Sequence, residues 1–467
     1  MGGALTTLTL LVIATIIAGA FTRLNYSRAL AIGGATPIGA ALVAGPVTVP
    51  TFYAVAIGAL VGIVIRGIRR ARQDDRTRLA PVPGGATLLG FSGWSISVTL
   101  VASLLFAGVV VYYPTSTPGP LAYGNVTIPN LAQIGYLILS VGVVFFIARS
   151  KPDPTVLGLA VTIVTVLSFW RFLGVTFGLP FPEGLFDNSP AFKLIEIAPG
   201  GVHRFRGILS EPAGLAATSL VAIAYMGSRV VRTRGWRRVG VVAVIAMAAI
   251  MASLSTSATF VVALVVVAGL ALLAGFARVV RLKPISPVVV GLVLAAGIAA
   301  YWVVPLLVKS VTGVVNAKVG SSSYDARSNV DGVSYEILFR TFGVGIGLGS
   351  HRPSSFLAAL FSTTGIPGTL LFAATIVLVI RAGLRNDAYR PVVWGLVALL
   401  TTKIIGGPDL ADTSGLLWIS IGLLAQAGVV AGTPVADPGL APPIRKLGDR
   451  AAADRSAVVR ASRSAPA

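Results

Sequence analysis

The chain contains no cysteine, and only 11% of its 467 residues are charged. Without cysteine, disulfides and thiolate metal sites are excluded, and the redox compartment cannot be inferred. Soluble globular proteins carry about 25% charged residues, so the low charged fraction excludes an ordinary soluble domain. In place of charge the chain is apolar, with 55% hydrophobic residues and a mean hydropathy of +0.87. We therefore expect an integral membrane protein.

Apolar runs of about 20 residues, each long enough to cross roughly 30 Å of hydrocarbon, recur from Gly3 to about Val430. We expect residues 1–432 to form one all-α, polytopic transmembrane bundle of about 12–13 spans with two large outer loops. A basic, disordered cytoplasmic tail is expected at 433–467. The expected spans are 3–21, 29–45, 50–66, 88–112, 130–148, 155–178, 208–227, 240–254, 257–277, 286–306, 354–380, 391–405 and 413–432.

The second of these spans has two readings. Gly33, Gly34, Pro37 and Pro46 interrupt it, so it is either a span or a re-entrant segment. The first run has neither a basic n-region nor an A-x-A cleavage site, and we expect a retained span rather than a secretory signal.

The basic residues follow a topological pattern. Lys and Arg number 37 against 16 acidic residues, and the formal net charge is +21. Most of the basic residues fall in short connections between apolar runs and in the tail, which predicts that these segments are cytoplasmic. The excess of positive charge is therefore a topology signal, and no nucleic-acid partner is expected. The same alternation places 113–129, 179–207 and 307–353 on the outer face.

Two of these outer segments gather the ionisable residues. The candidates there are His203, Arg204, Arg206, Arg327, Arg340, His351 and Arg352, and Glu211 begins the span that follows the first segment. An ionisable group at the end of an apolar helix is costly unless it is paired or faces water. Arg206 is a candidate partner for Glu211, and Ser210 is a candidate cap for the helix that Pro212 would begin.

The second outer segment ends in GVGIGLGSHRPSSF, residues 343–356. The dinucleotide fingerprint G-x-G-x-x-G fails because Leu348 stands three residues after Gly345, and no P-loop is present. Because its alternating glycines have no side chains, this stretch could form either a flexible joint or a place where a ligand approaches the backbone closely. The preceding SNVDGVSYEILFRTF, residues 328–342, predicts a short interfacial helix.

Several short elements occur in one order. They are R-x-x-G-x-x-x-E-P (Arg204, Gly207, Glu211, Pro212), a Ser-rich turn (Ser255, Ser257), an outer Arg (Arg327), G-x-G-x-G-S (345–350), a Ser pair (Ser354, Ser355) and G-x-x-G (Gly365, Gly368). As a set they resemble the bacterial O-antigen polymerase and O-antigen ligase superfamily. The turn SLSTSATF lacks the Arg that many members place after a Ser, and the two spaced Arg-to-Gly motifs of some polymerases do not map onto this chain.

The resemblance implies a GT-C-like membrane glycosyltransferase at the outer face of the bacterial inner (plasma) membrane. Its donor would be a polyprenyl-pyrophosphate-linked glycan, such as an undecaprenyl pyrophosphate oligosaccharide, and no metal or other cofactor would be needed. As a polymerase it would join repeat units in polysaccharide biosynthesis of the cell envelope. As a ligase it would transfer the glycan to another glycan or lipid acceptor. Other envelope assembly proteins and membrane lipids are the expected partners.

The chemistry of that reaction suits the outer residues. Guanidinium groups bind phosphate bidentately, so Arg204 and Arg327 are predicted to hold the pyrophosphate, with Arg206, Arg340 and Arg352 as second choices. His351 or Glu211 would be the catalytic base, and the resemblance favours His351 because family ligases carry a His in this outer loop.

Three further residues have less specific readings. His203 is expected to be structural, and Arg171 and Lys403 either snorkel or line the lipid groove. A transporter is the rival class, for which mid-membrane charges and repeated halves are expected. A noncatalytic scaffold for envelope assembly is a third reading, and it leaves the outer arginines and His351 unexplained.

Overall fold

The computed structural model describes residues 4–5, 7–21, 26–44, 47–72, 80–113, 118–150, 153–189, 194, 196, 204–280 and 322–432. It divides into two units, Met1–Val430 and Ala431–Ala467. Nearly all of the second unit lies outside the described residues, and so do the predicted span 286–306, His203 and the predicted disordered tail.

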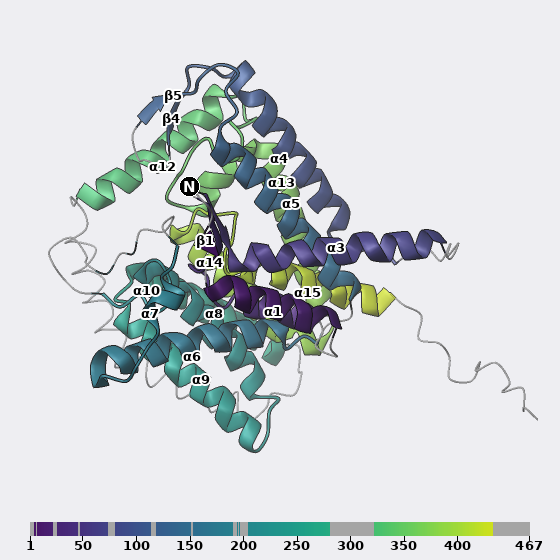
Figure 1. Ribbon diagram of the computed structural model, residues 1–467, viewed down its shortest axis with the longest axis vertical. Coiled ribbons are helices and arrows are strands. Elements are labelled where there is room, and N and C mark those ends of the chain that lie inside the picture. Colours follow the sequence, from purple (N-terminus) through teal and green to yellow (C-terminus); the bar gives the residue numbers. More distant parts are fainter. Residues whose placement is uncertain are drawn as a thin grey trace, which may run out of the picture. The chain divides into compact units, whose positions relative to one another are not determined.

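Long apolar helices dominate the first unit (Figure 1). Within the described ranges, nine helices are long and apolar enough to cross a membrane. They are α3 (Thr51–Arg72), α4 (Gly85–Leu105), α5 (Ile128–Arg149), α6 (Val156–Phe177), α8 (Pro212–Val230), α9 (Trp236–Leu254), α10 (Ala258–Val280), α13 (Phe356–Leu384) and α14 (Arg390–Gly406). Two shorter apolar helices are α1 (Thr7–Phe21) and α15 (Leu416–Gly432). The prediction of a helical, polytopic membrane protein is therefore confirmed.

The segment predicted as a second span is not a single helix. It forms a helix of 8 residues, α2 (Tyr26–Gly33), followed by the strand β2 (Ala40–Ala44). Strand β2 pairs antiparallel with β1 (Ala4–Leu5) and β3 (Val47–Pro50) in one small sheet. The helix ends at the glycine pair because glycine there removes side-chain packing and favours a turn. The interpretation of this segment as one spanning helix is therefore wrong.

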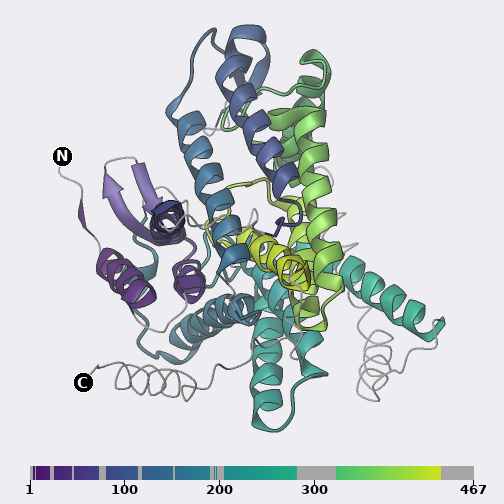
Figure 2. The same ribbon diagram turned by 90° about the vertical axis from the view of Figure 1, so that its right-hand side faces the viewer.

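The last helix, α15, lies at the centre of the apolar core. Its side chains from Leu416 to Ala427 are nearly all buried, and Trp418 is one of the largest fully buried side chains. A helix that is hydrophobic on every side is stable only where other helices surround it. Phe372 of α13 contacts Trp418, and Ile147 of α5 lies next to Gly422. Helices α4, α5 and α13 run side by side in both views (Figures 1 and 2).

Helix α13 is broken at Gly365, which has φ 65° and ψ −168° inside an otherwise helical run. The ring centroids of Phe356 and Phe372 are 5.6 Å apart. Sixteen residues of straight helix would separate them by about 24 Å along the axis. The two arms of α13 therefore bend toward each other within the predicted span 354–380.

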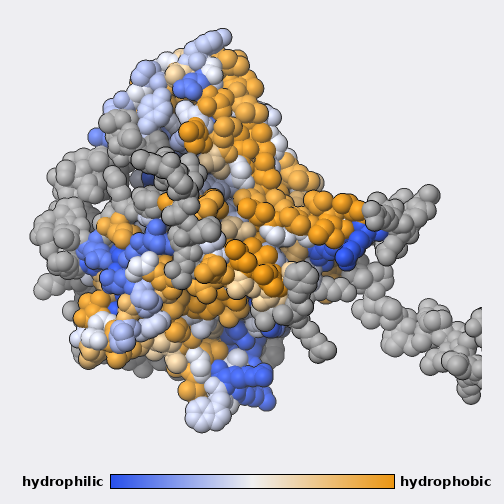
Figure 3. Space-filling model, viewed as in Figure 1, coloured by the Kyte–Doolittle hydropathy of each residue, from blue (hydrophilic) through white to orange (hydrophobic). Residues whose placement is uncertain are grey.

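Strand β4 (Val110–Tyr112) ends the predicted span 88–112 and pairs antiparallel with β5 (Pro118–Pro120) in the predicted outer segment that follows. In the other two predicted outer segments, α7 (Glu183–Phe186) is one turn, and α12 (Ser322–Arg340) is a helix of 19 residues that covers most of 328–342, where the sequence predicts a short helix. Val333 and Ile337 of α12 pack against Val109 and Val111. In Figure 3, apolar side chains cover the face that α3, α4 and α5 form, as expected for helices in lipid.

Candidate active site

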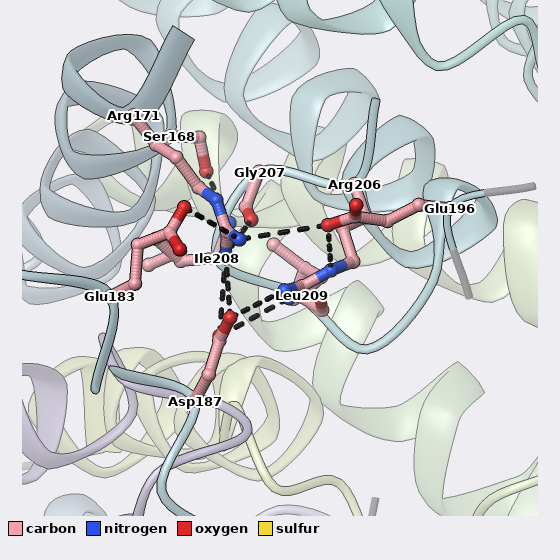
Figure 4. A network of polar contacts seen from close by, with 9 residues as sticks. All are labelled: Ser168, Arg171, Glu183, Asp187, Glu196, Arg206, Gly207, Ile208 and Leu209. Atoms are coloured by element: carbon pink, nitrogen blue, oxygen red, sulfur yellow. Dashed lines mark hydrogen bonds and ion pairs between the residues drawn. The ribbon is translucent and has the colours of Figure 1, made fainter. Parts of the chain in front are cut away.

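A buried ionic network holds the first outer segment in place (Figure 4). Arg171, in the last third of α6, places Nη1 3.0 Å from Oδ2 of Asp187 and Nη2 3.3 Å from Oε1 of Glu183. Arg206, in the loop before α8, binds the same Asp187 and places Nε 2.6 Å from Oε1 of Glu196. Asp187 follows α7 directly, so this single helical turn serves to aim its carboxylate between the two guanidinium groups.

Backbone carbonyls complete the coordination of both guanidinium groups. Arg171 Nη1 donates to the carbonyl of Gly207 at 3.0 Å, and Arg206 Nη1 donates to that of Leu209 at 2.9 Å. The two arginine residues are only 5% and 2% exposed. Burial by itself lowers the pKa of Arg206, but hydrogen bonds and ion pairs with Asp187 and Glu196 outweigh it and raise the pKa. Arg171 and Arg206 together with their carboxylate partners therefore form a buried structural clamp.

This clamp changes the expectations for Arg171 and Arg206. Arg171 does not extend to the membrane surface as a snorkelling side chain would, because it is buried among carboxylates. Arg206 pairs with Asp187 and Glu196 rather than with the Glu211 expected from sequence. Since three carboxylates surround two guanidinium groups, a pyrophosphate at Arg206 would meet net negative charge.

Arg204 occupies a different environment two residues earlier. Its Nε donates to the carbonyl of Ser255 at 3.1 Å and to Oγ1 of Thr256 at 3.0 Å, and Nη2 donates to the carbonyl of Thr256 at 3.2 Å. The side chain is half-buried, and these hydrogen bonds are partly exposed to solvent. Thr256 has a left-handed φ of 45°, unusual for a β-branched residue, so Arg204 stabilises a strained turn between α9 and α10. Two of the sequence elements that carry the resemblance are thus in direct contact.

Glu211 is the N-cap of α8, and Pro212 begins the helix. The predicted cap, Ser210, stands one residue too early. The Glu211 carbonyl accepts hydrogen bonds from the amides of Gly214 and Leu215, while its carboxylate makes no hydrogen bond or ion pair with any described side chain or amide. Next to the positive end of α8 and half-exposed, this carboxylate remains available to a ligand.

The alternating glycines form a packed, extended segment, and not a flexible joint. Gly343, Gly345, Gly347 and Gly349 all have φ between 78° and 88°. The amides of Ile346 and Gly347 donate to the carbonyls of Ser362 and Thr363, both at 2.9 Å, where α13 is broken. A Cβ on Gly347 would lie 2.5 Å from the Cα of Thr99 in α4. The close approach that these glycines permit is to the backbone of the protein itself.

His351 is fixed at the end of this glycine segment. It is 5% exposed, its Nδ1 accepts from the Tyr112 amide at 3.1 Å, and its Nε2 lies 2.8 Å from Oγ of Ser334. Because Nδ1 accepts, the neutral ring carries its proton on Nε2 and donates it to Ser334, whose hydroxyl donates to Val330. Burial lowers the pKa of His351 to about 4. Both nitrogens are engaged, so this ring has none free to accept a proton from a substrate hydroxyl.

The remaining predicted residues of the second loop lie around α12. Arg352 is exposed, and its amide donates to the Tyr112 carbonyl. Arg340, at the end of α12, places Nη2 2.6 Å from Oε1 of Glu336, and both side chains are about half exposed. Arg327 lies in α12, and its side chain falls outside the described residues. Among the described residues no hydrogen bond or ion pair joins this loop to the clamp.

Lys403 lies between the two regions. In the last turn of α14, its Nζ lies 5.7 Å from the ring centroid of Phe356 and donates to the carbonyl of Asp409 at 2.8 Å. One turn later, Gly406 faces Thr259 at the start of α10, next to the turn that Arg204 binds. The end of α14 therefore lies between the Arg204 turn and the start of α13. From sequence position alone, Lys403 either snorkels or lines a groove, because sequence position does not show that its Nζ lies near the ring of Phe356.

The described residues contain no group of three or more His, Asp or Glu that could hold a metal ion. Among the described residues of these regions, Arg204 and Lys403 are partly exposed cations, Arg352 is an exposed cation, and Glu211 is a partly exposed carboxylate. Such a set can bind an anionic group and accept a proton beside it. In comparisons with known proteins, no family model and no curated protein matches this chain.

Proposed function

We propose that this protein is a metal-independent membrane glycosyltransferase that polymerises polyprenyl-pyrophosphate-linked oligosaccharide repeat units at the outer face of the bacterial inner membrane. The observation that carries the proposal is the contact of Arg204 with the Ser255–Thr256 turn. It joins two elements that the O-antigen polymerase and ligase superfamily shows in the same order. The apolar spans supply the lipid-facing scaffold that a polyprenyl donor requires.

The residues have complementary tasks in the proposed reaction. The acceptor sugar hydroxyl attacks C1 of the donor glycan, the C1–oxygen bond to pyrophosphate breaks, and polyprenyl pyrophosphate leaves with the bonding electron pair. Arg204 stabilises the negative charge that develops on this leaving group, with Arg352 and Arg327 as further cations of the outer loops. Glu211 accepts the proton of the attacking hydroxyl. We assign the role of base to Glu211 and not to His351, because both ring nitrogens of His351 are hydrogen-bonded, whereas the carboxylate of Glu211 has no such bond to a described residue.

His351 acts in this proposal as a positioning residue. It connects β4 to α12 and thereby holds the end of the glycine segment next to Arg352. Arg206 and Arg171 likewise fix the segment that carries Arg204 and Glu211. These residues support the reaction through geometry and not by contact with the substrate.

A transporter is the second candidate, and the broken helix α13 is the observation that favours it. Transporters place substrates at helix breaks, where freed backbone groups coordinate the substrate. Here the freed carbonyls of Ser362 and Thr363 already accept hydrogen bonds from the glycine segment, and the amide of Ile366 donates to Gly343. Because the protein satisfies these groups at the break, the transferase remains the better supported function.

The test is incubation of purified protein with a lipid-linked oligosaccharide, followed by separation of the products. A ladder of longer products indicates a polymerase, and a single transfer to an added acceptor indicates a ligase. We expect Glu211→Gln to lower the rate by about 10²–10⁴ and Arg204→Ala by about 10²–10³. Arg204→Lys keeps the positive charge but lacks the guanidinium group that contacts the Ser255–Thr256 turn. Its rate therefore distinguishes the effect of the charge from the effect of the lost contact.

The matched control is Arg28→Gln, because Arg28 is exposed in α2 and belongs to neither outer loop. Its rate should equal that of the wild type. Wild-type rates in both Glu211→Gln and Arg204→Ala would refute the proposed site. Movement of the intact lipid-linked substrate across vesicles without any new glycosidic bond would establish the transporter instead.

A further inference from the structure

Eight arginines gather where two helix pairs turn, and we call them the arginine patch. Five lie in 229–238, where α8 turns into α9, and three lie in 381–390, where α13 turns into α14: Arg229, Arg232, Arg234, Arg237, Arg238, Arg381, Arg385 and Arg390. The only acidic residue in 229–238 and 381–390 is Asp387. In Figure 3, hydrophilic side chains cover the connection between α8 and α9.

The two connections form one surface. Helix α8 packs against both α9 and α14, which brings the turns at their ends together. Across them, Nη2 of Arg232 lies 3.9 Å from Oδ2 of Asp387, while Nη2 of Arg390 lies 2.7 Å from its Oδ1. Within residues 229–238 and 381–390 eight arginines thus accompany one carboxylate, and the surface that they form carries a net positive charge.

Apolar side chains accompany this charge. Trp236, the first residue of α9, is 88% exposed, and Leu384, at the end of α13, is 50% exposed. Tryptophan is enriched where spanning helices meet the headgroup layer of a membrane. Helix-end arginines beside an exposed tryptophan thus lie at the level where lipid phosphates are found.

The start of α9 also favours an anion. Its N-cap, Gly235, has no side chain to satisfy the first amides, and the first turn contains no acidic residue. Arg237 and Arg238 stand there instead, and cations at a helix N-terminus interact unfavourably with the helix dipole. A bound anion would attract both arginines and the positive end of the helix dipole, and would so offset the repulsion between them.

We propose that the arginine patch binds the phosphate headgroup of anionic phospholipids and so anchors the α8–α9 and α13–α14 turns to the membrane surface. The positive-inside rule by itself explains positive charge in short cytoplasmic connections. It does not explain why two such connections lie together, nor why an exposed tryptophan lies beside them. The site is independent of the proposed active site, which lies at other helix ends.

The experiment measures lipid binding to the full-length, detergent-solubilised protein by native mass spectrometry. Phosphatidylglycerol is titrated against phosphatidylcholine with the same acyl chains. We expect the wild type to bind phosphatidylglycerol more tightly, and Arg234→Gln/Arg237→Gln to weaken that binding by about fivefold for each arginine at low salt. Trp236→Ala should weaken the binding of both lipids. Circular dichroism verifies that these exposed substitutions leave the helices intact.

The matched control, Arg340→Gln, removes an exposed arginine from α12 and should leave the preference for phosphatidylglycerol unchanged. Equal binding of the two lipids by the wild type, or an unchanged preference in the double variant, would overturn the proposal. So would an equal loss in Arg340→Gln, since binding would then follow net charge alone. Displacement of phosphatidylglycerol by millimolar inorganic phosphate would assign the patch to free phosphate and not to lipid.

Discussion

At the scale of single residues, the buried environment of His351 predicts that the free energy of unfolding of the protein depends on pH. The folded pKa is lowered to about 4 by burial, whereas an unfolded histidine titrates near 6.5. The folded state therefore resists protonation, and its stability is full above about pH 6.5 and falls as the pH drops toward 4. We expect a loss of about 3 kcal/mol across this window. Chemical denaturation in detergent at several pH values measures it.

The control for that experiment is His351→Gln, which has no ionisable group at this position. Its unfolding free energy should fall less steeply than that of the wild type between pH 6.5 and 4. Parallel curves for the two proteins would show that His351 does not titrate as a buried, neutral ring.

Asp187 allows a second comparison at this scale, because an exposed carboxylate offers a matched control. Its side chain is 12% exposed and bridges Arg171 and Arg206, so Asp187→Asn leaves two buried cations poorly compensated. We expect the free energy of unfolding to fall by about 3–5 kcal/mol. Asp387→Asn removes a carboxylate that is 69% exposed, and it should cost less than about 1 kcal/mol. Similar losses in both variants, measured by denaturant titration, would contradict the clamp.

At the scale of elements, the glycine segment should be rigid rather than mobile. Gly347 has φ 87°, and an added Cβ would lie 2.5 Å from the Cα of Thr99, so Gly347→Ala must displace α4 or the segment. We expect a large loss of thermal stability. Gly332→Ala is the control, because an added Cβ in α12 meets no atom within 4 Å, and it should be neutral or gain about 0.5–1 kcal/mol. If Gly347→Ala were as stable as Gly332→Ala, the segment would be the flexible joint.

Sequence reasoning located the elements better than it located their contacts. Apolar length predicted the spans, since bilayer thickness demands it, and α12 was recognised from its position between spans. The break at Gly365 was missed because a single glycine followed by Pro367 is tolerated in a membrane helix. The partners of Arg206 were missed because Asp187 and Glu196 lie in loops, where no periodicity relates them to an arginine.

At the scale of the whole molecule, the absence of cysteine makes the predicted topology directly testable. Asn125 is exposed in the connection before α5, and Arg234 is exposed in the connection between α8 and α9. Charge bias places the first outside the cell and the second inside. In intact cells, a membrane-impermeant maleimide should therefore label Asn125→Cys at once. Arg234→Cys should be labelled only after permeabilisation, because the bilayer separates it from the reagent. Labelling of both positions from the same side would contradict the predicted orientation and, with it, an active site on the outer face.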